Sequence, residues 1–232
     1  MNAIEIRDLN VYLSGSHILQ GVTFEVPSNK VTALLGRNGV GKTTTLRAIM
    51  GLVPSTGSIE LFGRSIDGMP TFKIAQSGIG YVPEDRDIFA SLTVAENLSL
   101  AVRDKNPNYD TVYSLFPELS QRASQRAGTL SGGQQQMAAI ARSLLNKNQI
   151  ILVDEPTKGL APKLVGEVAE ALTAVASETT MLLVEQNLAL VKSVAEHIIV
   201  MSQGKVIFQG EPDNLDDDAF VHSMLGVSGG LH

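Results

Sequence analysis

The segment GRNGVGKT, residues 36–43, has the residue types and spacing needed to hold a polyphosphate. Its glycines permit a turn that aims backbone N–H groups at phosphate oxygens, while Lys42 adds positive charge and the Thr43 hydroxyl can ligate Mg²⁺. An apolar run precedes the segment and a helical pattern follows it, which is the context that this motif requires. The sequence therefore predicts a nucleotide site whose ligands are Gly36, Arg37, Asn38, Gly39, Val40, Gly41, Lys42, Thr43 and Thr44.

Two acidic residues, Asp154 and Glu155, follow the apolar run IILV at residues 150–153. Ligands of α/β sheets bind beyond the C-terminal ends of the strands, and neighbouring strand residues point in opposite directions. We therefore predict that Asp154 serves Mg²⁺ while Glu155 orients or deprotonates an attacking water, because phosphoryl transfer needs one such group. The alternative is a pair of exposed loop acids, which the preceding phosphate loop disfavours.

The string LSGGQ, residues 130–134, has the pattern of a helix N-terminus, with Ser131 as N-cap and Gln134 at the third helical position. Such a terminus presents free N–H groups that suit a γ-phosphate. Consecutive glycines, Gly132 and Gly133, are costly in a first helical turn unless another backbone approaches closely. We predict that these four residues bind phosphate, and a capped helix without a ligand is the alternative.

Together, these strings resemble the motifs of ATP-binding-cassette (ABC) ATPases, and nearly the whole chain is similar to one such subunit. The resemblance implies ATP and Mg²⁺ as cofactors. It also implies a dimer, in which Ser131 and Gly133 of one subunit face the nucleotide held by the other. An aromatic residue near the N-terminus stacks on adenine in this family. Tyr12 is the candidate here, with Leu13 as the alternative occupant, and a half-buried strand tyrosine is the alternative interpretation of Tyr12.

Three strings depart from the common family pattern. Glu84 in YVPEDRDIF stands where most members have glutamine, Gln186 in LVEQN stands where most have the switch histidine, and EPTKGLAP replaces an aspartate-containing loop. Gln186 can hydrogen-bond a γ-phosphate but cannot carry a proton, whereas Glu84 adds an anion able to ligate Mg²⁺. The expected catalytic residues are thus Lys42, Glu155 and Gln186, and the expected metal ligands are Thr43, Glu84 and Asp154.

These departures, with TVAENL and FPEL, resemble the ATPases of branched-chain amino-acid importers and their relatives for urea and short-chain amides. The leading hypothesis is an ATP-hydrolysing importer subunit for branched-chain or related amino acids. A urea or amide importer, and a soluble ABC ATPase in cofactor assembly, are alternatives. Translation factors of this family carry two cassettes, whereas this chain has one phosphate loop, and a small-molecule kinase would leave LSGGQ without a role.

Composition limits the partners and the location. The formal net charge of −6 disfavours nucleic acid, and the absence of cysteine excludes disulfides and thiolate metal sites. No apolar run approaches the ~20 residues that span a bilayer, and the first residues lack the apolar core of a signal peptide. We expect a cytoplasmic protein, peripheral on the inner face of the membrane. Its expected partners are a second ABC ATPase in a homo- or heterodimer, permease subunits and, indirectly, a solute-binding protein.

Alternating apolar strands and helices predict an α/β fold. The resemblance implies that this fold is the ABC cassette of P-loop NTPases. We expect a mainly parallel sheet core, an antiparallel N-terminal β part and an inserted helical lobe. Residues 1–232 would form a single ABC domain, with 1–83 and 147–232 as the core and β subdomain and 84–146 as the helical subdomain. In that lobe, Thr93 and Glu96 have the spacing of a capping box.

Overall fold

An antiparallel sheet is formed by strands from the first part of the chain. The computed structural model of the protein describes residues 1–226. The strands of this four-stranded sheet are, in spatial order, β2 (Ser16–Pro27), β1 (Asn2–Leu13), β4 (Thr56–Leu61) and β5 (Arg64–Ser65). The predicted antiparallel β part is therefore confirmed.

The second sheet is six-stranded and mainly parallel, as the sequence predicted. Only β10 within it pairs antiparallel, with β9. Its central strands are buried on both faces, which is why they read as largely apolar runs. In spatial order the strands are β10 (Lys205–Gly210), β9 (His197–Ser202), β3 (Val31–Leu35), β8 (Thr180–Val184), β7 (Ile150–Asp154) and β6 (Ile79–Val82).

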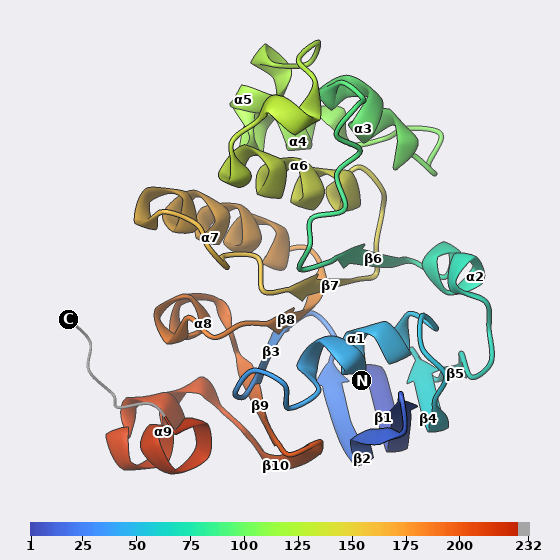
Figure 1. Cartoon of the computed structure of the whole chain (residues 1–232), viewed down its shortest axis with the longest axis vertical. Helices are drawn as coiled ribbons and strands as arrows, with labels where there is room; N and C mark the ends of the chain where they lie inside the picture. Colours follow the sequence, from blue (N-terminus) through green and yellow to red (C-terminus); the bar gives the residue numbers. More distant parts are fainter. Residues whose placement is uncertain (227–232) are drawn as a thin grey trace.

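Every described element between β6 and β7 is helical, and Figure 1 shows this part, in green, gathered at one end of the molecule. Thr93 forms the predicted capping box with Glu96 at the start of its first helix. The division of the chain into subdomains at residues 84 and 146 stays a prediction. The elements are α3 (Val94–Leu100), α4 (Tyr109–Leu115), α5 (Pro117–Gln121), the 3₁₀ turn η1 (Ala127–Thr129) and α6 (Gly132–Leu144).

The remaining helical elements either connect strands or follow the last described strand, β10. Within residues 1–226, every helix is too short or too polar to cross a bilayer. The connecting helices are α1 (Lys42–Ile49), α2 (Thr71–Gln76), α7 (Pro162–Ala176) and α8 (Leu188–Val194), and the elements after β10 are the 3₁₀ turn η2 (Pro212–Asp216) and α9 (Asp218–Leu225).

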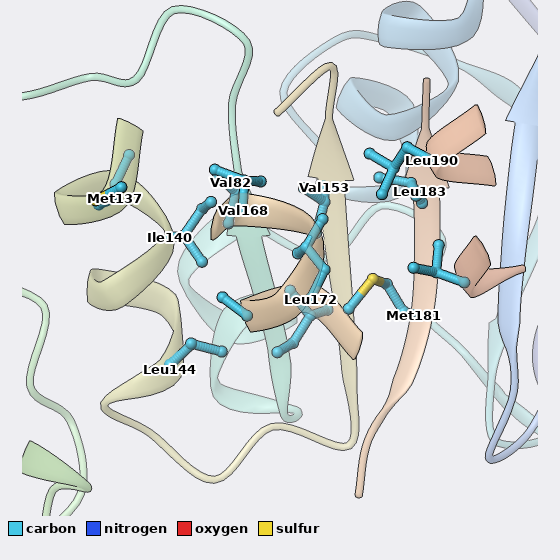
Figure 2. Packing of buried hydrophobic residues seen from close by; sticks show 14 of the residues in the cluster. Val82, Met137, Ile140, Leu144, Val153, Val168, Leu172, Met181, Leu183 and Leu190 are labelled. Carbon is cyan, nitrogen blue, oxygen red and sulfur yellow. The ribbon is translucent and has the colours of Figure 1, made fainter. Parts of the chain in front are cut away.

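Alternate residues of the parallel strands face two different hydrophobic clusters. Val153 and Leu183 belong to the cluster that contains residues of α6, α7 and α8, which Figure 2 shows from close by. Leu152 and Leu182 belong to the opposite cluster, with residues of α1 and the antiparallel sheet. The helical part therefore shares a continuous apolar core with the sheet, and this packing fixes the start of α6 relative to α7.

The packing of Gly133 accounts for one of the two glycines at the start of α6. The residue is buried, and a Cβ atom placed on it would lie 2.3 Å from Cδ1 of Leu164 in α7. Gly132 is exposed, and a Cβ there would approach the guanidinium of Arg86, the far end of a flexible side chain, at 3.1 Å. Packing within this chain thus favours glycine at one of the two positions, a reason that the sequence pattern did not reveal.

We expect Gly133→Ala to lower the free energy of unfolding by about 1–3 kcal/mol, because the added methyl overpacks the contact with Leu164. Gly132→Ala is the matched control. It should leave the stability unchanged or raise it by up to about 1 kcal/mol, because alanine favours a helix more than glycine does. Urea unfolding measures both values. Equal stability of the two variants would contradict the packing argument, and a Leu164→Ala background should reduce the penalty of Gly133→Ala.

Candidate nucleotide site

The predicted phosphate loop connects the C-terminal end of β3 to the first turn of α1. Gly36 and Gly41 both have positive φ, 147° and 109°. A Cβ at Gly36 would lie 2.4 Å from the carbonyl oxygen of Met201, and one at Gly41 would lie 2.5 Å from Leu19 Cδ2. These positions need glycine for conformation and for space, so the loop can pass close to its neighbours while its amides stay free for phosphate.

Lys42 holds the loop together from within. Its side chain is 4% exposed, and Nζ donates to the carbonyl oxygens of Gly36 and Arg37 at 2.8 and 3.1 Å. Burial lowers the pKa of Lys42, and the nearby Glu155 carboxylate, 3.6 Å away, partly offsets this effect. An ammonium in this position is desolvated and already oriented, which is how a lysine can attract the outer phosphates of a nucleotide.

Asp154 ends β7 beside the first turn of α1 and has the properties of a cation ligand. It is fully buried, and Oδ1 accepts a hydrogen bond from the Thr43 hydroxyl at 3.1 Å. Oδ2 is buried without a hydrogen-bond partner among the described residues. Burial raises the pKa of Asp154 to about 6. Buried carboxylate oxygens need a partner, and a hard divalent cation such as Mg²⁺ supplies one, so Asp154 and Thr43 fit the predicted metal site.

Glu155 lies directly beside this pair and is buried as well. Its Oε1 accepts a hydrogen bond from Gln186 Nε2 at 2.7 Å and lies 3.6 Å from Lys42 Nζ. Gln186 Nε2 also donates to Asn38 Oδ1 in the phosphate loop at 2.6 Å. The structure therefore brings Lys42, Glu155 and Gln186 together, as expected from the sequence, and their catalytic roles stay predictions.

Lys158 is a further site residue, which the sequence analysis missed. Its Nζ forms an ion pair with Glu84 and lies 3.5 Å from Oε2 of Glu155. Lys158 thus links Glu84 to Glu155, the expected catalytic carboxylate. Glu84 contacts this lysine, and its predicted role as a metal ligand stays a prediction. The departure EPTKGLAP was the available signal, although the string alone does not indicate which acids the lysine faces.

The signature residues form the predicted helix terminus on α6. Ser131 and Gln134 make a capping box: Gln134 N–H donates to Ser131 Oγ at 3.3 Å, and Ser131 N–H donates to Gln134 Oε1 at 3.0 Å. Gln134 Nε2 also donates to Glu118 at 2.7 Å. Ser131 and Gly132 are exposed, whereas Gly133 packs inward. Phosphate binding by Ser131, Gly132, Gly133 and Gln134 stays a prediction.

Tyr12 lies near the end of the β1–β2 hairpin and is 61% exposed, so its interpretation as a half-buried strand residue is wrong. Its ring stacks on that of His17, with centroids 4.1 Å apart and an interplanar angle of 11°. Leu13 is partly buried and packs against the hydrophobic cluster that contains residues of α1 and the antiparallel sheet. Of the two candidates, Tyr12 thus offers the accessible aromatic ring, and its stacking on adenine stays a prediction.

Comparison with known families agrees with this geometry. A family model described as ABC transporter matches residues 19–158. The chain belongs to the ABC transporter family. As a member it carries an ATP-binding cassette, and this membership implies ATP hydrolysis.

Relatives match almost the whole length of this ABC protein. BraG of Pseudomonas aeruginosa, a high-affinity branched-chain amino acid transport ATP-binding protein, is 37% identical over 206 residues, 86% of this chain and 88% of BraG. LivF of Archaeoglobus fulgidus, a probable branched-chain amino acid transport ATP-binding protein, is 33% identical over 228 residues, 94% and 97% of the two chains. The ADP conformation of MJ1267, an ATP-binding cassette of an ABC transporter, superimposes with a TM-score of 0.79 at 25% identity, covering 96% and 98%.

We expect Lys42→Ala to weaken ATP binding about 10- to 150-fold. Hydrogen bonds to a charged group contribute about 1.5–3 kcal/mol, and that free energy converts to this range of affinity. Fluorescence titration of the purified protein with a labelled ATP analogue measures the dissociation constant. Lys73→Ala, an exposed substitution in α2, is the control. An unchanged affinity for the ATP analogue in Lys42→Ala would contradict the assignment of the phosphate loop to the nucleotide site.

We expect Asp154→Asn to change how stability depends on pH. A carboxyl whose folded pKa is raised from 3.8 to about 6 binds more protons in the folded state, so the free energy of unfolding falls as the pH rises between these values. Without nucleotide or Mg²⁺, Asp154→Asn should exceed the wild type by about 1–3 kcal/mol at pH 7 and match it near pH 4. Urea unfolding across this pH range tests the prediction, with a substitution of the exposed Asp110, Asp110→Asn, as control. If the free energy of unfolding varied with pH in the same way in the wild type and in Asp154→Asn, the prediction would be contradicted.

Proposed function

We propose that this chain is the ATP-hydrolysing subunit of an importer for branched-chain or related amino acids. The 37% identity with BraG over 86% of the chain is the observation that carries the proposal. The geometry of the site supports the hydrolytic half of it, because a buried lysine, a buried carboxylate pair and a bridging glutamine meet at the end of the parallel strands.

In the proposed reaction, the loop amides and Lys42 hold the triphosphate, and Glu155 accepts a hydrogen bond from the attacking water. Gln186 orients Glu155 through its Nε2, which is 2.7 Å from Oε1. Mg²⁺, when bound, would neutralise phosphate charge, and Thr43 and Asp154 are the residues that would hold it. Glu84 would join them through water or directly.

The second half of the site comes from another ATPase subunit, whose Ser131 and Gly133 or their equivalents would face the γ-phosphate. The exposed N-terminal end of α6 supports this arrangement, because the capping box engages the amides of Ser131 and Gln134 and not those of Gly132 and Gly133. The partner is either a second copy of this chain or a related subunit. ATP would thus bind between two subunits, and closure of the dimer would drive transport.

A groove between the core and the helical part would receive the permease. It is lined by side chains from β6, α2 and α6 and by three arginines, Arg86, Arg103 and Arg142. The guanidinium of Arg142 lies over the ring of Phe89, 5.3 Å from the ring centroid. The Phe89 side chain is half exposed. This surface would suit a cytoplasmic permease helix with acidic and apolar residues. The chain would thereby lie on the inner face of the membrane, with a solute-binding protein as an indirect partner.

We expect Glu155→Gln to lower ATP hydrolysis at least about 100-fold, because general-base catalysis contributes about 10²–10⁴. The variant should accumulate as a nucleotide-bound dimer that sedimentation velocity detects. Glu167→Gln, in α7, is the matched control. A persistent monomer with ATP, even when mixed with a co-expressed partner ATPase, would contradict the dimer.

The solute is tested with the permease complex that co-purifies with the chain. We expect ATP-dependent uptake of labelled leucine into vesicles containing that complex and a solute-binding protein, and none with Glu155→Gln. Uptake of urea or a short-chain amide in place of leucine would support the alternative importer. Co-purification with a soluble scaffold and no membrane protein would contradict the importer itself.

A further inference from the structure

Glu185 is a buried acidic residue that the reaction described above does not use. It directly follows β8, as Glu155 directly follows β7, and the two strands are neighbours with Asp154 paired to Val184. Its side chain is 3% exposed. A buried carboxylate is costly unless several donors stabilise it, so its contacts indicate what it holds in place.

Donors from two separate segments converge on this carboxylate. Oε1 accepts from the Thr157 hydroxyl and from the Thr157 backbone N–H at 3.3 Å. Oε2 accepts from the backbone N–H groups of Gln186 and Asn187, at 2.5 and 3.1 Å. Asn187 is the N-cap of α8, where the helix dipole also favours an anion. Glu185 thus joins the loop after β7 to the loop after β8.

The first of these loops carries Glu155 in an unusual conformation. The φ angle of Glu155 is 45°, in the left-handed region that residues other than glycine seldom adopt, and such strain persists only where the surroundings fix it. On one side, Glu155 N–H donates to the Val184 carbonyl at 2.9 Å. On the other side, Thr157 is fixed by Glu185, so the two anchors bracket the strained residue.

The second loop carries Gln186, whose side chain reaches Glu155 and Asn38. Its backbone N–H is bound to Glu185, so the point from which the Gln186 side chain projects is fixed by the same carboxylate as Thr157. A change at Glu185 would therefore displace Glu155 and Gln186 relative to each other without touching the phosphate loop directly.

We propose that Glu185 is a positioning residue for ATP hydrolysis, which holds Glu155 and Gln186 in the geometry needed for attack on the γ-phosphate. A carboxylate is required because all four groups that face it are donors. An amide in its place would offer one acceptor oxygen and turn its NH₂ group toward donors. The inference rests on the proposed ATPase activity and is independent of the solute.

The test compares Glu185→Gln with the wild type in the assembled transporter. We expect kcat to fall at least about tenfold with the KM for ATP within about twofold, because small misplacements of reacting groups cost rate more than binding. Glu185→Asp keeps both acceptor oxygens and should recover part of kcat. The control is Thr180→Val at the other end of β8, where the buried hydroxyl accepts from Asn29 N–H at 2.9 Å. It should lower the melting temperature and leave kcat unchanged.

A second measurement does not depend on hydrolysis. Hydrogen–deuterium exchange of the isolated full chain should accelerate at least about fivefold in both segments 155–158 and 186–188 in Glu185→Gln, and in neither in Thr180→Val. Faster exchange in only one of the two segments would overturn the inference. So would a Glu185→Gln variant that hydrolyses ATP as fast as the wild type, provided that the wild type is active. A wild-type transporter that does not hydrolyse ATP would instead contradict the proposed function, and exchange would still decide the role of Glu185.

Discussion

The parallel pairing of β3, β8 and β7 is the constraint on which the site depends. Their registers place the C-terminal ends of the three strands at one edge of the sheet, where Val184 lies opposite Leu34 and Asp154. The phosphate loop, the carboxylate pair and the Gln186 segment begin at these ends. Because alternate strand residues are locked into two hydrophobic clusters, a shift of one residue in any strand would turn its apolar side chains to the wrong cluster. Core packing thus fixes the positions of the polar groups.

Most of the charged groups at this edge of the sheet lie in ion pairs with a neighbour. Three carboxylates, those of Glu84, Asp154 and Glu155, face two ammonium groups, those of Lys42 and Lys158. Asp154 is the member without a close cation at its free oxygen, and its pKa is raised in consequence of burial. The position that lacks a positive charge is thus the one where the proposed function places Mg²⁺, while Glu155 has Lys42 on one side and Lys158 on the other.

Local patterns predicted the main helices and strands, whereas the roles of the site residues stay predictions. The phosphate loop, the two capping boxes and the acids at the end of β7 are each encoded within a few neighbouring residues, and the structure forms each of them there. Lys158, Glu185 and the packing of Gly133 against Leu164 were missed, because these contacts join residues distant in sequence and are set by strand register or helix packing. Such contacts follow from tertiary structure, and a single sequence gives no measure of them.

The three departures from the family pattern meet in one network around Glu155. Gln186 donates to one carboxylate oxygen, Lys158 lies against the other, and Lys158 also pairs with Glu84. A histidine at position 186 would bring a titratable charge to this carboxylate, whereas glutamine brings a hydrogen bond of fixed charge. Here the positive charge comes from Lys158, which Glu84 holds in place. The substitutions are therefore best understood as one set, in which Lys158 supplies the positive charge that Gln186 cannot carry, and Glu84 pairs with that lysine.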